Sequence, residues 1–177
     1  SNSIVKSIID PKWTKLHLNA TIMYPYILEA NALIGQEAVR KILGDLSFDI
    51  HHFKNVGNWV SVDFFDEFIA KFSEHGDPYI LNRNAGYRSL SKEVLGVNYF
   101  VIKHFFSPRI AFQTFEKFLP KFNKTRIYQI IDSGPTFCRI RLTNPDRTLL
   151  PKHPSAKENW FALVDGYVKT LTGKPSE

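Results

Sequence analysis

The stretch SPRIAFQTFEKFLPKFNKTRIYQIIDSGPTFCRIRL, residues 107–142, decides the fold, because its pattern predicts one amphipathic helix followed directly by a two-stranded hairpin. Ser107 is a favourable N-cap, and Pro108 suits the first helical position, where its missing N–H costs nothing. The helix therefore starts at a defined point, and we expect residues 108–119 to pack their apolar face on the hairpin formed by residues 126–142. The apolar residues that recur at helical spacing are Ile110, Ala111, Phe115, Phe118 and Leu119.

The hairpin separates its side chains cleanly between two faces. Residues 127–131 alternate at the strand period, and Ser-Gly-Pro-Thr at 133–136 is turn chemistry. On the return strand Cys138, Ile140 and Leu142 share one face, whereas Phe137, Arg139 and Arg141 share the other. If the arginine face lines a cleft, the arginines hold a carboxylate or phosphate. If it points outward, which we favour, any ligand is neutral and lies on the Cys138 side.

Elsewhere the chain is mostly helical. Residues 15–20 alternate as an edge strand, and two stretches without periodicity, 47–59 and 144–154, predict loops. The result is a single α+β domain over residues 1–177, in which N-terminal helices pack on a small antiparallel sheet. Apolar periodicity predicts helices over residues 21–34, 36–46, 62–75, 78–90, 96–106 and 156–171.

Composition excludes several classes of protein. The 177 residues carry a net charge of +6, but the basic residues are scattered, and the densest group, within residues 117–126, fits a solvated helix end. We therefore expect no nucleic-acid partner. No stretch approaches the ~18 apolar residues of a membrane span. The single cysteine, Cys138, allows no internal disulfide, and no signal peptide opens the chain, so we expect a cytoplasmic location.

No combination of residues predicts catalysis or metal binding. His51 and His52 lie in a polar connector without a third ligand at suitable spacing, and His104 has apolar helical neighbours. Cys138 on an apolar strand face is more typical of a small core residue than of a nucleophile. We therefore expect neither an enzyme nor a metal site in this chain.

One short motif needs separate treatment. Haem-based nitric oxide sensors carry Tyr-x-Ser-x-Arg, whose residues hold the haem propionates, and here Tyr87 and Ser89 occupy the first two positions. The third position is Ser91, so the anchoring charge is missing. This disfavours haem, and we expect no cofactor.

The aromatic content leaves two alternatives open. The 15 Phe, 7 Tyr and 3 Trp fill a core, or some of them line an apolar cavity that a few polar groups close. Under the second alternative, we expect a ligand pocket between the sheet and the helices predicted at 96–106 and 108–119. Its candidate residues are Tyr87, Tyr99, Phe105, Arg139, Arg141 and Trp160.

Taken in order, residues 16–43, 58–78, 95–143 and 159–175 resemble the N-terminal sensory domains of bacterial signalling proteins. These domains precede histidine kinase, nucleotide cyclase or AraC-type output modules, and their fold is related to haem–nitric oxide and vinyl-reductase-type ligand-binding domains. Two departures stand out. Members often carry a cysteine where this chain has Asn159-Trp160, and they commonly continue into a Cys-containing strand pair that is missing here.

The resemblance implies a non-catalytic sensory domain, an N-terminal fragment of a longer signalling protein. It binds a small, largely apolar molecule, regulates a downstream output module and forms a homodimer. The alternative is a dimerisation or partner-docking module without a ligand. A closed apolar cavity favours the sensor, whereas a filled core beside a large exposed apolar patch favours the docking module.

Overall fold

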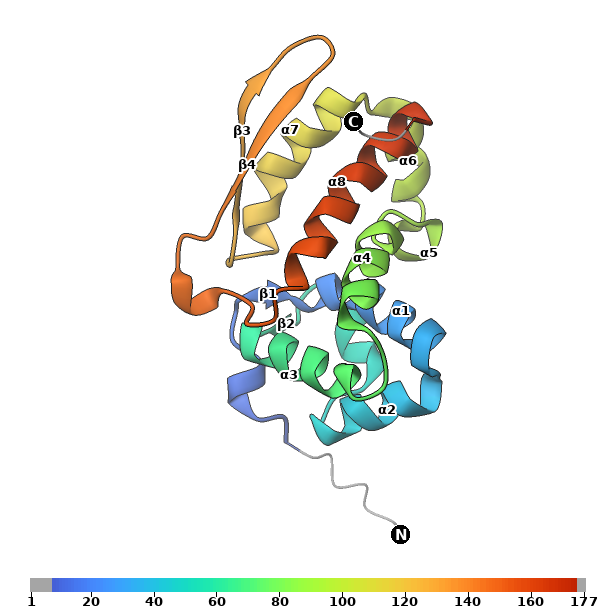
Figure 1. Ribbon diagram of the computed structural model, residues 1–177, viewed down its shortest axis with the longest axis vertical. Helices are drawn as coiled ribbons and strands as arrows, with labels where there is room; N and C mark the ends of the chain where they lie inside the picture. The colour runs from blue at the N-terminus through green and yellow to red at the C-terminus, as the bar shows by residue number, and fades with distance from the viewer. Residues whose placement is uncertain (1–7, 175–177) are drawn as a thin grey trace.

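The computed structural model describes residues 8–174, and over this range the chain forms eight α-helices and two small two-stranded antiparallel sheets (Figure 1). This confirms the predicted α+β class. The helices are α1 (Tyr24–Ile34), α2 (Gln36–Asp45), α3 (Val62–Ser73), α4 (Pro78–Arg88), α5 (Lys92–Leu95), α6 (Asn98–Phe105), α7 (Pro108–Phe118) and α8 (Ala156–Thr172). The sheets pair β1 (Leu18–Asn19) with β2 (Trp59–Val60), and β3 (Ile127–Ser133) with β4 (Cys138–Thr143). Short 3₁₀ helices are η1 (Pro11–Trp13), η2 (Ala20–Met23), η3 (Ile50–Lys54), η4 (Leu119–Lys121) and η5 (Arg147–Leu149).

Local capping chemistry fixes where several helices begin. The Ser61 hydroxyl accepts a hydrogen bond from the Phe64 N–H at 3.0 Å, and the Asp77 carboxylate accepts one from the Tyr79 N–H at 2.8 Å. Ser107 does the same for α7. Each side chain satisfies a backbone donor that the first helical turn leaves without a partner. The predicted starts of α3, α4 and α7 are confirmed.

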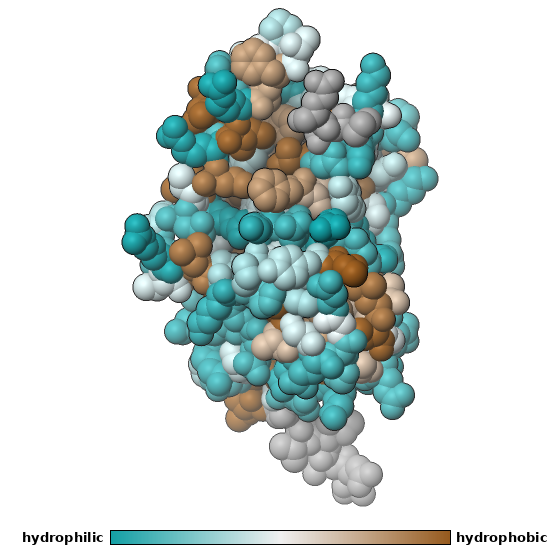
Figure 2. All heavy atoms as spheres, viewed as in Figure 1, coloured by the Kyte–Doolittle hydropathy of each residue, from teal (hydrophilic) through white to brown (hydrophobic). Residues whose placement is uncertain are grey.

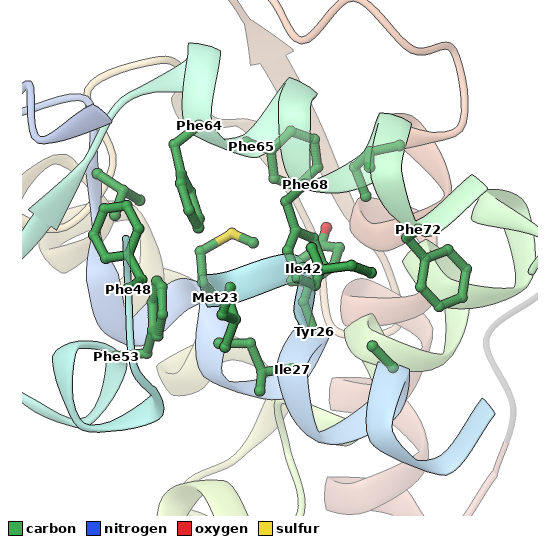
Figure 3. Packing of buried hydrophobic residues seen from close by; sticks show 14 of the residues in the cluster. Met23, Tyr26, Ile27, Ile42, Phe48, Phe53, Phe64, Phe65, Phe68 and Phe72 are labelled. Carbon is green, nitrogen blue, oxygen red and sulfur yellow. The ribbon is translucent and has the colours of Figure 1, made fainter. Parts of the chain in front are cut away.

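The larger core lies between α1, α2, α3, η2 and η3, in the lower half of the molecule as drawn in Figure 1, and Figure 3 shows its side chains. Phe64 and Phe68 from α3 and Phe53 from η3 are fully buried and lie ring against ring. Met23 and Ile27 from the segment η2–α1 are also fully buried in this cluster. The phenylalanine stripe of α3 therefore fills a solid core.

The hairpin β3–β4 belongs to a second, smaller cluster in the upper half. As predicted, α7 packs on β3, and the Phe115 ring lies edge-on against Tyr128 at a centroid distance of 4.9 Å. Trp160 from α8 completes this cluster. The prediction that N-terminal helices cover the sheet was wrong for this hairpin, because α1, α2 and α3 bury their apolar faces mainly against one another and leave the hairpin to α7 and α8.

Helix α4 connects the two halves, since it packs on α1 and most extensively on α8. A buried polar chain links the three helices: the Tyr26 hydroxyl donates to Asn82 at 2.9 Å, and the Asn82 amide donates to Ser155 at 2.9 Å. These bonds satisfy polar groups that are removed from water. Within residues 8–174, none of the helices combines the length and the apolar character that a membrane crossing requires.

Candidate functional site

The candidate site is an open groove of about 500 Å³ between α4, α5, α6 and α8. Tyr87 lies at the end of α4, Tyr99 is on α6, and Gly166 is on α8. Its wall is mostly apolar, and its volume is within the ~300–1,000 Å³ range of small-molecule sites. The complete lining is Tyr87, Leu90, Ser91, Lys92, Glu93, Tyr99, Gly166, Lys169 and Thr170.

Tyr87 is held in place by charged residues of α8. Its hydroxyl donates to Asp165 Oδ2 at 2.6 Å, and Lys169 Nζ lies 2.7 Å from the same oxygen. The hydrogen bond to the Asp165 carboxylate raises the pKa of Tyr87, and the same carboxylate raises the pKa of Lys169. The Lys169 ammonium also lies 5.1 Å from the centre of the Tyr87 ring, a cation–π distance. The tyrosine therefore remains neutral, with its ring at the wall of the groove.

The opposite wall carries a second aromatic and cationic group. Lys92 Nζ lies 5.6 Å from the Tyr99 ring centre and 5.3 Å from that of Phe100. Lys103 Nζ lies 5.8 Å from the Tyr99 ring. Within residues 8–174, neither lysine forms an ion pair with a carboxylate. The groove thus combines two tyrosine rings with positive charge at its rim.

Gly166 determines how closely α8 approaches the turn after α4. A Cβ at this position would lie 3.0 Å from Leu90 Cδ1 and 3.3 Å from Tyr87 Cδ1. Glycine therefore lets the Tyr87 ring and the buried Leu90 side chain form the floor of the groove. An isolated glycine within a helical pattern can indicate such a close approach, and Gly166 lies within the helix predicted at 156–171.

The structure brings together only two of the six predicted site residues, Tyr87 and Tyr99. Phe105 lies on α6 and is 78% exposed. Trp160 is buried in the second cluster, against Phe115. The Arg126 guanidinium lies 4.9 Å above the Trp160 ring, and burial lowers the pKa of Arg126 to about 10.

Arg139 and Arg141 point away from the second cluster and are exposed. Arg139 lies 3.8 Å from Asp132 across the strand pair. Cys138 and Ile140, on the other face of β4, are half-buried against the cluster. Burial raises the pKa of the Cys138 thiol, and the nearby Glu116 carboxylate adds to this effect. The thiol is therefore protonated at neutral pH, the form that is poor as a nucleophile.

We expected the pocket between the hairpin, α6 and α7. In the structure α7 packs directly on β3, and side chains of the second cluster occupy the space beside the hairpin. Phe112, Leu119, Tyr128 and Trp160 are buried there. Burial raises the pKa of Tyr128, whose hydroxyl has no hydrogen-bond partner among the described residues.

The serines of the haem-sensor motif have structural roles. The Ser89 hydroxyl donates to the Ala85 carbonyl at 2.8 Å, and Ser91 caps α5. Among residues 8–174, no group of three His, Cys, Asp or Glu side chains is arranged to hold a metal ion. Lys92, Lys169 and Gly166 were not assigned to the site from the sequence. A signal for Lys169 was present, because Asp165 and Lys169 have the i,i+4 spacing of a helical ion pair.

A second groove of about 750 Å³ lies between α2 and the end of α3. Its side chains are mainly charged, with both signs present, and Lys71 and Asp45 form an ion pair at 3.7 Å. Such a lining is typical of solvated helix faces, and it lacks the aromatic rings of the groove at Tyr87 and Tyr99. Comparisons with known proteins found no matching family model, and neither a curated protein nor a solved structure matches the chain significantly.

Proposed function

We propose that this chain is a non-catalytic sensory domain that binds a small, largely apolar molecule between Tyr87 and Tyr99. In this proposal the bound molecule regulates a downstream signalling output module in a bacterial cytoplasm, and the domain acts as a homodimer. We also propose that the fold is related to haem–nitric oxide and vinyl-reductase-type ligand-binding domains. This part of the proposal rests on the four sequence segments that resemble the sensory domains in the same order along the chain.

The observation that carries the proposal is the groove itself. Tyr87 on α4 and Tyr99 on α6 supply rings to one mostly apolar space of ligand size. Tyrosine rings offer flat contact area at a low cost in conformational entropy, which suits them to planar apolar ligands. Lys92 at the rim would favour a ligand that also carries a negative or electron-rich group.

Helix α6 supplies a route for a signal. None of its residues is buried, so few contacts hold it against the rest of the molecule. A ligand in contact with Tyr99 would bind most tightly to conformations in which α6 closes over the groove. Binding would therefore increase the population of these conformations.

The alternative, a partner-docking module, is favoured by a different observation. The larger core is filled, and apolar side chains are exposed on the upper half of the molecule, where Figure 2 shows them gathered beside the hairpin and α8. The exposed large apolar side chains of these elements include Phe100 and Phe105 on α6, Ile131 and Phe137 in the hairpin, and Phe161 on α8.

A thermal-shift and fluorescence titration with 2-naphthol, 2-naphthoate and decanoate separates the two functions. We expect at least one naphthalene probe to raise the Tm, and Tyr87→Ala and Tyr99→Ala each to weaken its binding by about tenfold, the loss typical of one aromatic contact. Tyr79→Ala is the matched control, because Tyr79 is also on α4 and is 39% exposed, against 38% for Tyr87, but lies outside the groove. If no probe binds, or the control weakens binding equally, the docking module becomes the better description.

A further inference from the structure

The two edges of the sheet β3–β4 differ in whether the rest of the protein covers them. On the β3 side, the Ile130 N–H donates to the Glu116 carboxylate of α7 at 2.8 Å. This bond satisfies an edge donor and places α7 along β3, one of the ways in which proteins protect an edge strand.

The β4 edge is open. Ile130 pairs with Ile140, and its N–H points away from β4 toward Glu116, so these two residues form a non-hydrogen-bonded pair. In an antiparallel ladder the partner, Ile140, then points its own N–H and C=O away from β3, and so does Leu142 two residues on. Within residues 8–174, no hydrogen bond from outside the hairpin reaches these groups.

The open edge is also regular enough to accept another strand. The bulge in the register falls on β3, at Ile131, because Ile130 and Asp132 pair with the consecutive residues Ile140 and Arg139. Strand β4 contains no proline. It therefore lacks the two features, bulge and proline, that most directly prevent pairing at an edge.

The side chains of β4 specify what an added strand should carry. On the outer face, Arg141 forms no ion pair within the described residues, and Arg139 has only the long contact to Asp132, with both side chains mostly exposed. On the inner face, Ile140 is half-buried and Leu142 is 39% exposed, beside half-buried Val164 and Val168 of the second cluster. An added strand would meet positive charge on one face and an apolar surface on the other.

We propose that the β4 edge docks an extended segment of a partner protein in which acidic and apolar residues alternate. The acidic residues lie opposite Arg139 and Arg141, and the apolar residues extend the inner face over the second cluster. A second copy of this chain fits the edge poorly. Pairing β4 with itself about Ile140 or Arg141 places arginine opposite arginine, and like charges directly opposite each other destabilise a strand pair.

The test is a titration of the full chain with a fluorescein-labelled ten-residue peptide of alternating Glu and Val, read by anisotropy. We expect binding that weakens with salt, and about tenfold weaker binding in the double variant Arg139→Ala/Arg141→Ala, as two exposed ion pairs are lost. The matched control is Arg109→Ala/Lys117→Ala, which removes the same charge from exposed positions on α7. Amide exchange should slow at Ile140 and Leu142 when the peptide is bound.

Three results would overturn the proposal: no binding, equal binding of an alternating Lys and Val peptide, or equal weakening in the α7 control. Sedimentation velocity tests the other possible occupant of the edge, a second copy of this chain. A dimer of the free chain that Ile140→Pro dissociates would assign the edge to a second copy instead, because proline removes an outward N–H. The arginine variants change only exposed side chains, so they test the proposal even if the proline variant fails to fold.

Discussion

At the scale of single residues, His17 ties the protonation of one imidazole to the start of α3. Its Nδ1 accepts a hydrogen bond from the Val62 N–H at 3.1 Å, which the doubly protonated ring cannot do. Burial lowers the pKa of His17, and the charge of Lys15 lowers it further, whereas Asp63 and Asp146 act in the opposite direction. The folded protein therefore prefers neutral His17.

The pH dependence of stability follows from this preference. Between the lowered pKa of folded His17 and the unfolded value of ~6.5, the unfolded chain binds more protons. The contribution of His17 is thus fully present above pH ~6.5 and is lost as the pH falls through the folded pKa. We expect the free energy of unfolding to decrease as the pH falls from ~6.5 toward the lowered pKa of folded His17, by at most ~1.4 kcal/mol per pH unit for this one group.

The measurement is urea denaturation at several pH values for the wild type and for His17→Asn, whose side-chain oxygen keeps an acceptor near Val62 without titrating in this range. We expect a shallower pH slope in the variant. His51→Asn, at an exposed position in η3, is the control and should retain the wild-type slope. Identical slopes in all three proteins would contradict the role given to His17.

At the scale of elements, the crossing of α4 and α8 depends on a glycine. A Cβ at Gly86 would lie 2.5 Å from the Asn159 carbonyl oxygen and 2.8 Å from Ala162 Cβ. A backbone carbonyl in a helix cannot move aside cheaply. We therefore expect Gly86→Ala to lower the free energy of unfolding by ~1–3 kcal/mol, although alanine is the better helix former.

Gly44 provides the matched control for this prediction. It is in α2, and a Cβ there would meet nothing within 4 Å. Gly44→Ala should therefore stabilise the protein by ~0.5–1 kcal/mol, the usual gain from removing a helical glycine. Urea denaturation followed by circular dichroism measures both changes, and a stabilising Gly86→Ala would show that α4 and α8 can separate at little cost.

Elements were predictable from sequence where their signals are local. Ser107 marked the start of α7 correctly, and the helices predicted from residues 62 and 78 begin there in the structure. Ser61, Asp77 and Ser107 each bond the first turn of the helix that follows, so these starts depend on local sequence. Helix α5 was missed, since its four residues after Ser91 are too few to show a period. The bulge at Ile131 was also missed, because register depends on the pairing of β3 with β4 and not on either strand alone.

At the scale of the whole molecule, the candidate site could be predicted only in part. Tyr87 and Tyr99 were singled out by residue type, but their meeting depends on how α4, α6 and α8 pack, which no local pattern encodes. Trp160 was assigned to the same pocket, yet the cluster around Tyr128 buries it. The faces of β4 followed from strand alternation, since Arg139 and Arg141 are exposed and Cys138 is half-buried.

The two halves of the molecule should also differ in how readily they open. Helix α3 buries Phe64, Phe68 and Phe72 completely, whereas α6 buries none of its residues. Amides exchange through openings whose free energy depends on the buried contacts that must break. We therefore expect α6 amides to exchange by local opening, well before global unfolding, and α3 amides to exchange only with the global transition.

Native-state hydrogen exchange with increasing urea measures this difference directly. Opening of α6 should be almost independent of urea, because it exposes little new surface, whereas α3 exchange should show the full denaturant dependence of unfolding. Helix α7 tests whether helix length explains the contrast, because it has 11 residues, close to the 12 of α3. It buries only Ala111 and Phe112, so we expect its amide protection to be intermediate between those of α3 and α6. Equal protection of α3 and α6 would mean that a further contact, such as a second copy of the chain, covers α6 in solution.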